Sequence, residues 1–101
     1  HYSHAISKHP AEGDFRVQEQ FGGVERALDA PADAKALAEA ALATTDMLLE
    51  CGTLLYARVD MVRDGEGAFR LMEQELIEPS LFLHFAPNEG ATFAKAVLTF
   101  K

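Results

Sequence analysis

Three carboxylates and one guanidinium stand close together in this chain, on two segments joined by a short turn. Arg58 and Asp60 lie two residues apart on the first segment. Glu73 and Glu75 lie two residues apart on the second. Residues two apart on a β-strand point to the same face, so paired strands would gather these side chains on one face. Acids gathered in this way repel one another unless a cation lies between them. Carboxylate oxygens are ligands that Mg²⁺ prefers, so the pattern predicts a magnesium site formed by Asp60, Glu73 and Glu75.

The residues alone also allow less specific interpretations. Charged residues are common on solvated sheet faces, so the three acids could simply face water. Both segments are otherwise apolar, however, and a carboxylate buried without a partner is costly. Arg58 likewise has two interpretations. It is either a salt-bridge partner that neutralises Glu73 or Glu75, or a fixed cation that faces phosphate or a developing oxyanion.

A β-hairpin is the element that would hold these side chains together. Residues 54–63 and 68–77 are apolar segments of strand length. The sequence Asp64-Gly65-Glu66-Gly67 between them is a strong turn signal. We therefore expect two antiparallel strands, with the acids on one side of the pair.

Three further segments are expected to be extended. Residues 1–8 and 15–21 alternate apolar and polar side chains and each predict a strand, and residues 24–28 predict a short strand or an extended segment. Gly22-Gly23 ends the second of these, because glycine allows positive φ or a close approach of two backbone segments.

Arg16 and Gln18 lie two apart in the predicted strand 15–21 and would share one of its faces. An exposed polar face is the interpretation that the pattern alone favours. The chain has no P-loop and no GxGxxG sequence. A bound nucleotide would therefore be held by residues other than a phosphate-binding glycine loop.

Two helices complete the expected elements. The first opens at Ala30-Pro31-Ala32-Asp33, where proline suits the first turn and the acid suits the positive helix end, and it fades near Thr44-Thr45. Residues 47–52 fit a final turn or a loop, and residues 81–85 have no assignment. The second helix starts at Pro87-Asn88, and the apolar residues expected on its inner face are Phe93, Ala94, Val97 and Leu98. The order of strands, helix, strands and helix predicts an α+β fold in which a mainly antiparallel sheet packs on helices.

Composition limits the possible partners. The 101 residues suit one small domain or part of a larger one. The net charge of -7 and the lack of a basic stripe exclude a nucleic-acid partner. No apolar run is long enough for a membrane span, so we expect no membrane partner. Cys51 is the only cysteine and is interpreted as inert, which fits a cytoplasmic protein without disulfides.

The spacing of the four central residues resembles the C-terminal signature of the ATP-grasp ligases. In that superfamily an Asp on one strand, and a Glu-x-Asn or Glu-x-Glu on the next, hold the Mg²⁺ ions that bridge the phosphates of ATP. The resemblance implies ATP and two Mg²⁺ ions as cofactors, with Asp60, Glu73 and Glu75 as the metal ligands. It also implies that Arg58, in an Arg-x-Asp pair, is a catalytic residue near the tetrahedral intermediate.

A second stretch, from Gly13 to Gly23, is similar to glutathione synthetases and to ligases that add glutamate to a ribosomal protein. Those enzymes have approximately Arg-x-Asn, three residues, then Gly-Gly. By similarity Arg16 is a catalytic residue that contacts phosphate or the acyl substrate. Gln18 stands where Asn is usual, and it joins Lys8 and Arg16 as a phosphate- or substrate-binding candidate. The segments 3–8, 56–60 and 75–81 look closest to a bacterial branch that includes the ligase closing the ring of cycloserine.

These resemblances imply an ATP- and Mg-dependent ligase that joins a carboxylate to an amine through an acyl phosphate. Residues 1–101 would form the C-terminal subdomain of the ATP-grasp fold, and the chain, which starts in mid-pattern without Met, would be a fragment. The missing upstream subdomain would supply phosphate-binding lysines and the adenine hinge, so the fragment alone is expected to be inactive. The parent enzyme is expected in the cytoplasm, with a homo-oligomer as a possible state. The alternatives are a non-catalytic metal- or nucleotide-binding regulatory module and a purely structural or interaction domain.

Overall fold

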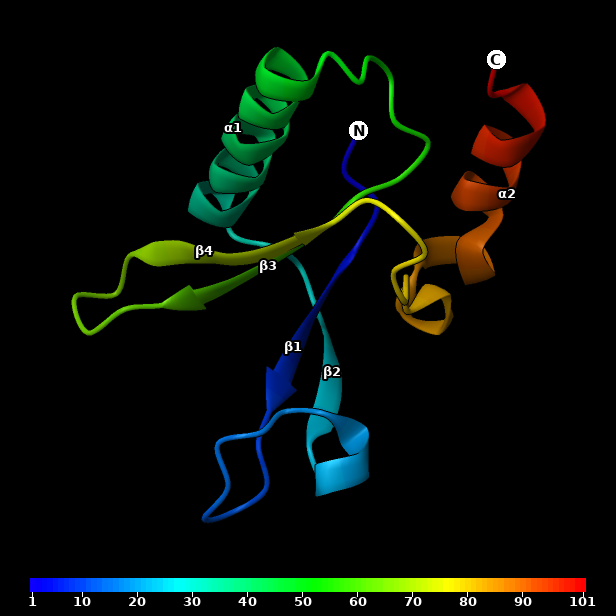
Figure 1. Ribbon diagram of the computed structural model, residues 1–101. Helices are drawn as coiled ribbons and strands as arrows, with labels where there is room; N and C mark the ends of the chain where they lie inside the picture. The colour runs from blue at the N-terminus through cyan, green and yellow to red at the C-terminus, as the bar shows by residue number, and fades with distance from the viewer. The chain divides into compact units, whose positions relative to one another are not determined.

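The computed structural model describes residues 1–101, except for the side chain of Glu19. The chain divides into two compact units. The first unit contains His1–Ala30 and Phe82–Thr92, and the second contains Pro31–Leu81 and Phe93–Lys101. Figure 1 shows the elements of both units, coloured along the chain. The predicted α+β class with antiparallel strands is confirmed, although the strands form two separate two-stranded sheets.

The sheet of the first unit pairs β1 (Ala5–His9) with β2 (Val24–Leu28). The strands are antiparallel, with Ala5 opposite Leu28 and His9 opposite Val24. The predictions for residues 1–8 and 24–28 are therefore confirmed apart from the first four residues, which precede β1.

The strand predicted over residues 15–21 is wrong. This part of the chain is a loop followed by a single 3₁₀ turn, η1 (Glu19–Phe21). The Asp14 carboxylate accepts a hydrogen bond from the backbone N–H of Arg16 at 3.0 Å, and such a local bond competes with strand pairing. Phe15 is 89% exposed whereas Val17 and Phe21 are half-buried, so the alternating apolar residues do not form one buried face.

The first unit also contains the short turns η2 (Leu83–Phe85) and η3 (Pro87–Gly90). The last helix was predicted to start at Pro87-Asn88. Asn88 and Glu89 instead have positive φ angles of 53° and 52°, which no right-handed helix contains. The continuous helix α2 (Ala91–Thr99) therefore begins three residues later than Asn88.

Helix α1 (Ala32–Leu49) opens the second unit and is longer than the sequence indicated. Thr44 and Thr45, where the helix was expected to fade, bond their hydroxyls to the carbonyls of Ala40 and Ala41 at 2.8 and 3.0 Å. Bonds of this kind slightly destabilise a helix, but they do not end this one, and residues 47–49 form its last turn. The helix ends at Glu50, which is left-handed at φ 51° and bonds its N–H to the Asp46 carbonyl at 2.7 Å.

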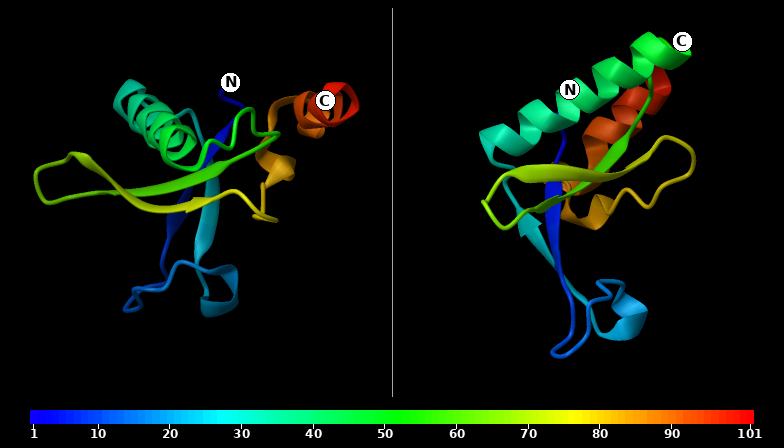
Figure 2. Two further views of the ribbon diagram at one scale, coloured as in Figure 1. Left: turned by 45° about the horizontal axis from the view of Figure 1, so that its top comes forward. Right: turned by 60° about the vertical axis from the view of Figure 1, so that its left-hand side comes forward.

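The predicted hairpin is present as β3 (Arg58–Arg63) and β4 (Phe69–Glu75). It is shorter than residues 54–63 and 68–77. The turn forms where the sequence predicts it, with Asp64 N bonded to the Ala68 carbonyl at 2.8 Å. Helix α1 packs along β4, which can be followed in Figure 1 and from two further sides in Figure 2.

The apolar core is thin throughout the described residues. Ala34 in α1 is the one apolar residue there that is buried, at 6% exposure. The predicted inner face of α2 is wrong in large part, since Val97 and Leu98 are 48% and 86% exposed. Phe93 alone of the four predicted residues is half-buried, with its ring edge-on to Tyr56 at 6.1 Å. No helix among the described residues has the length and apolarity needed to cross a membrane.

Candidate functional site

The register of the β3–β4 hairpin places the four predicted residues on one face. Arg58 is opposite Glu75, and Asp60 is opposite Glu73. The alternation predicted from the sequence is thereby confirmed for these strands. Immediately beyond Asp60 the register shifts, because Met61 pairs with Leu71. The shift is a β-bulge next to the acids, a feature that re-aims side chains and recurs near active sites.

The other face of the hairpin is occupied by α1. Gln74 lies between Glu73 and Glu75 on β4, so its side chain points to the opposite face. Its Nε2 donates a hydrogen bond to the Thr45 hydroxyl of α1 at 2.7 Å. Within this unit the helix therefore covers the face that lacks the acids and leaves the acidic face uncovered by α1.

Arg58 binds two of the three acids. Its Nε and Nη2 donate to the two carboxylate oxygens of Asp60 at 2.9 and 3.0 Å. Its Nη1 lies 3.0 Å from a carboxylate oxygen of Glu75 and donates to the Ser80 carbonyl at 3.2 Å. The salt-bridge interpretation of Arg58 therefore describes this structure, with Glu75 and Asp60 as its partners.

The environment keeps Arg58 charged. Partial burial by itself lowers the pKa of Arg58, but the hydrogen bond with Asp60 and the charges of Asp60, Glu75 and Glu73 raise that pKa above its ordinary value. Arg58 can therefore act as a fixed positive charge and not as a proton donor.

Glu73 differs from the other two acids. It is exposed, and none of the described side chains forms an ion pair with it. No group of three or more His, Cys, Asp or Glu side chains among the described residues is close enough to hold one metal ion. Asp60 and Glu75 are turned to Arg58 instead. The predicted ligands thus share a face but do not converge on one point.

The predicted residues of the first unit lie in a loop and on β1. Arg16 forms a two-point contact with Asp14 and lies over the ring of Phe21 at 3.8 Å. The common strand face expected for Arg16 and Gln18 is wrong, because neither residue is in a strand. Lys8 is half-buried in β1, with its Nζ 4.6 Å from the centre of the Phe82 ring.

Gly22 and Gly23 show the positive φ and the close backbone approach expected of them, although no strand ends there. Gly22 has a positive φ of 81°, and a Cβ added to Gly23 would lie 2.1 Å from the Val17 carbonyl oxygen. The backbone N–H groups of Phe21 and Gly23 both donate to the Gln18 carbonyl, at 3.0 and 3.2 Å. The glycines therefore allow a tight loop that only residues without a side chain can close.

Sequence reasoning assigned no role to three residues that contact the candidates. These are Asp14 and Phe21, which hold Arg16, and Ser80, which accepts a hydrogen bond from Arg58. One signal was present for Asp14. It stands two residues from Arg16, as Asp60 does from Arg58, and both pairs form the same two-point contact.

No family model matches the chain. The chain is 38% identical, over an alignment 112 positions long, to the cycloserine biosynthesis protein DcsG of Streptomyces lavendulae. The match covers 95% of this chain and 33% of that protein. The crystal structure of D-cycloserine synthetase DcsG matches with a TM-score of 0.77 and 39% identity, again over 95% of this chain and 33% of the other. The chain thus spans about a third of the length of this relative. It is homologous to that third of a biosynthetic enzyme and has the same fold there.

Proposed function

We propose that this chain is part of an ATP- and Mg²⁺-dependent ligase that joins a carboxylate to an amine through an acyl phosphate. The observation that carries the proposal is the hairpin face that α1 leaves uncovered, on which Asp60 stands opposite Glu73 and Arg58 opposite Glu75. The resemblance of these residues to the ATP-grasp signature supports the chemistry. Homology to part of a protein named a synthetase supports an enzyme as the parent.

The donor set suits Mg²⁺ in its chemistry. All three candidate ligands are carboxylates, and hard divalent cations take oxygen ligands. Glu73 is exposed and engaged in no ion pair with a described residue, so it is open to a metal ion. Asp60 and Glu75 would first turn from Arg58. A metal bound by these three residues would neutralise phosphate charge during phosphoryl transfer.

Arg58 would leave Asp60 and Glu75 when the metal and the substrates bind, and would then face the reacting group. Its positive charge, freed from Asp60 and Glu75, would stabilise the negative charge that develops on the reacting group. The raised pKa of Arg58 keeps that charge throughout, so its contribution is electrostatic. The Ser80 carbonyl, which binds Nη1 at 3.2 Å, would hold the guanidinium near the hairpin during the exchange.

The first unit would contribute contacts to oxyanions. Arg16 is the residue proposed for phosphate or the acyl carboxylate, and Gln18 and Lys8 are proposed as further substrate contacts. The acyl substrate is proposed to be a small amino-acid-like carboxylate, since the relative is named a D-cycloserine synthetase. The cytoplasm is the proposed location, as the source of ATP.

One observation favours a second candidate function. The ion pairs of Arg58 with Asp60 and Glu75 also suit a hairpin whose acids serve only to hold it together. A domain of that kind would bind neither metal nor nucleotide.

Calorimetric titration of the full-length protein with ATP, with Mg²⁺ and with both distinguishes these functions. The ligase predicts nucleotide binding that becomes much tighter when Mg²⁺ is present. Binding of Mg²⁺ that is indifferent to ATP would point to a metal-binding regulatory module. No heat from either ligand would contradict the proposal and leave the structural role.

A further inference from the structure

Arg16 is held on two sides within one short loop of the first unit. The Asp14 carboxylate accepts hydrogen bonds from its Nε at 3.1 Å and its Nη2 at 2.9 Å. The ring of Phe21 lies against the flat face of the guanidinium, with 3.8 Å between Cζ and the ring centre. The Arg16 side chain is nevertheless 47% exposed. Asp14 and Phe21 therefore fix the orientation of a cation that solvent still reaches.

Asp14 uses only one edge of the guanidinium. Arginine has five N–H donors in a planar fork, and the pair formed by Nε and Nη2 leaves the edge between Nη1 and Nη2 available. That edge matches the spacing of two oxygens in a phosphate or carboxylate group. Arg16 can therefore bind Asp14 and an external oxyanion at the same time.

Arg58 gives an internal comparison for this geometry. It has the same side-on pair with Asp60, but its Nη1 also binds Glu75 and the Ser80 carbonyl. An oxyanion would reach the outer edge of Arg58 only after these contacts break. Of the two arginines, Arg16 is the one prepared to receive an anion.

The loop keeps Phe21 in place beneath Arg16. The Phe21 N–H donates to the Gln18 carbonyl at 3.0 Å, and Gly23 approaches the Val17 carbonyl more closely than any residue with a Cβ allows. The pKa of Asp14 is lowered, first by the hydrogen bond from the Arg16 side chain and then by that from the Arg16 backbone. Asp14 thus stays ionised at neutral pH, and its pair with Arg16 stays formed.

We propose that Asp14 and Phe21 are positioning residues that present the free edge of Arg16 to an oxyanion. The oxyanion is a phosphate group of the nucleotide or the carboxylate of the acyl substrate, an identification that rests on the proposed function. A guanidinium fixed in advance loses less rotamer freedom when the anion binds, which strengthens binding without a new contact.

The substitution Asp14→Asn distinguishes the positioning of Arg16 by Asp14 from the effect of the Asp14 negative charge on a bound anion. Removing a negative charge beside the site would strengthen the attraction of an anion by electrostatics alone. Loss of positioning would weaken it. We expect Asp14→Asn in the full-length protein to weaken anion binding about tenfold in calorimetry, because the arginine must then be ordered by the ligand itself. Glu12→Gln removes an acid of the same loop and is expected to leave binding unchanged or slightly tighter.

Three probes identify the source of the anion. Weaker binding of Mg²⁺–ATP and of inorganic phosphate in Asp14→Asn assigns the site to the nucleotide. Weaker binding of acetate alone assigns it to the acyl carboxylate. Unchanged or tighter binding of all three would overturn the inference.

Phe21→Leu is a second, independent variant. It keeps an apolar side chain in the loop but removes the aromatic face. We expect it to weaken, severalfold, the binding of the same probes that Asp14→Asn affects. Adding Asp14→Asn to Arg16→Met should have no further effect, since there is then no guanidinium to position. The thermal unfolding midpoints of all variants are measured in parallel, so that loss of the fold is recognised.

Failure of this inference is distinguishable from failure of the proposed function. A protein that binds phosphate through Arg16 but shows no Mg²⁺-dependent binding of ATP would contradict the ligase and leave the inference intact. If Asp14→Asn binds the anion more tightly while ATP binding still depends on Mg²⁺, the positioning role is contradicted and the ligase proposal stands.

Discussion

Asp64 closes the β3–β4 turn through its side chain. Its carboxylate accepts hydrogen bonds from the backbone N–H groups of Glu66 and Ala68 at 2.9 and 3.0 Å and from the Arg70 Nε at 2.7 Å. The bond from Arg70 is the largest cause of a lowered pKa for Asp64, followed by the bonds from Ala68 and Glu66. The turn that supports the acidic face therefore depends on an ionised Asp64.

The pH dependence of this turn follows from the direction of that shift. The pKa of Asp64 in the folded chain lies below its ordinary value of 3.8, so its contribution is fully present above that value and is lost as the pH falls through the lower one. We expect a carboxyl NMR titration to give a midpoint below 3.8 for Asp64. Arg70→Gln should move the midpoint upward, and a midpoint that ignores this substitution would contradict the assigned cause.

For the site residues, the sequence predicted the shared strand face of the hairpin but not the contacts of each side chain. The two-residue spacing in β3 and β4 was sufficient to place Arg58 and the three acids on one face. It could not decide whether Arg58 faces a ligand or the acids, because that choice depends on rotamers and on Ser80, which lies beyond the hairpin. It failed for Arg16, because the hydrogen bond that the Arg16 backbone N–H donates to the Asp14 carboxylate outweighed a weak alternation.

At the scale of elements, the loop before β2 depends on a glycine that the sequence singled out. A Cβ on Gly23 would come within 2.1 Å of the Val17 carbonyl oxygen, so the backbone would have to move. We expect Gly23→Ala to destabilise the full-length protein by about 1–3 kcal/mol in urea denaturation. Gly65→Ala is the matched control, because a Cβ there meets nothing within 4 Å. Equal stability of the two variants would contradict this account of the loop.

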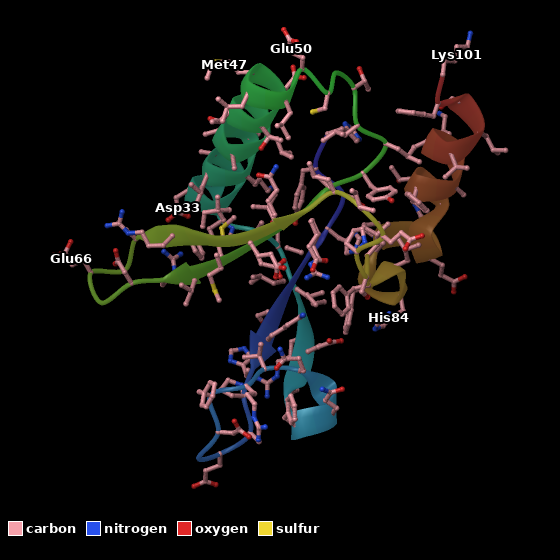
Figure 3. All side chains as sticks on the ribbon, in the orientation of Figure 1. Asp33, Met47, Glu50, Glu66, His84 and Lys101 are labelled. Atoms are coloured by element: carbon pink, nitrogen blue, oxygen red, sulfur yellow. The ribbon has the colours of Figure 1, made fainter. Side chains whose placement is uncertain are left out.

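Helix α1 ends on a residue that glycine would suit better. Glu50 is left-handed at φ 51°, a conformation that costs a residue with a Cβ about 1–2 kcal/mol. A glycine at this position would avoid that cost, but its greater conformational freedom in the unfolded chain offsets part of the gain in stability. We expect Glu50→Gly to stabilise the protein by about 0.5–1 kcal/mol, and Glu39→Gly in the middle of the same helix to destabilise it by about 1 kcal/mol. Thermal unfolding checks both signs, and a loss of stability in Glu50→Gly would contradict the assigned end. Figure 3 shows the Glu50 side chain at the end of α1.

Elements with a strong pattern were predicted well, and elements with a weak one were not. The α1 helix and the β3–β4 hairpin have clear periodicity and a clear turn, and both are present. The strand at 15–21 and the inner face of α2 were inferred from few apolar residues, and the structure leaves Phe15 and Leu98 exposed. Apolar residues mark the inner face of an element only where another element packs on them. The sequence of a domain with a thin core does not show which elements pack together.

At the scale of the whole molecule, little apolar surface is removed from water. Among the described residues, large apolar side chains remain exposed at the end of α1 and beyond β4, at 72% for Met47, 72% for Leu48 and 86% for Ile77. Small domains bury a smaller fraction of their surface and have correspondingly low stability. This chain is therefore expected to be only marginally stable when it is produced by itself.

The 101-residue chain alone is therefore expected to have no ligase activity. It contains no glycine loop of the phosphate-binding type, and it corresponds to 33% of the synthetase that it resembles. Phosphate release from ATP by this chain should stay at background, and its urea midpoint should be lower than that of the full-length protein. Sustained product formation by the chain alone would contradict the prediction.

We propose that the acidic face of the hairpin holds Mg²⁺ against ATP, and substitution of Glu73 tests this proposal. Glu73 is the acid without an ion pair to the described residues, so its removal leaves the contacts of Arg58 in place. Glu66→Gln is the matched control, since Glu66 is an exposed acid at the tip of the same hairpin (Figure 3). The measurement is the dissociation constant of ATP with and without Mg²⁺ for the full-length protein and both variants. We predict that Glu73→Gln reduces the gain in affinity due to Mg²⁺ by about tenfold or more, whereas Glu66→Gln keeps it. An undiminished effect of Mg²⁺ in Glu73→Gln would contradict the claim.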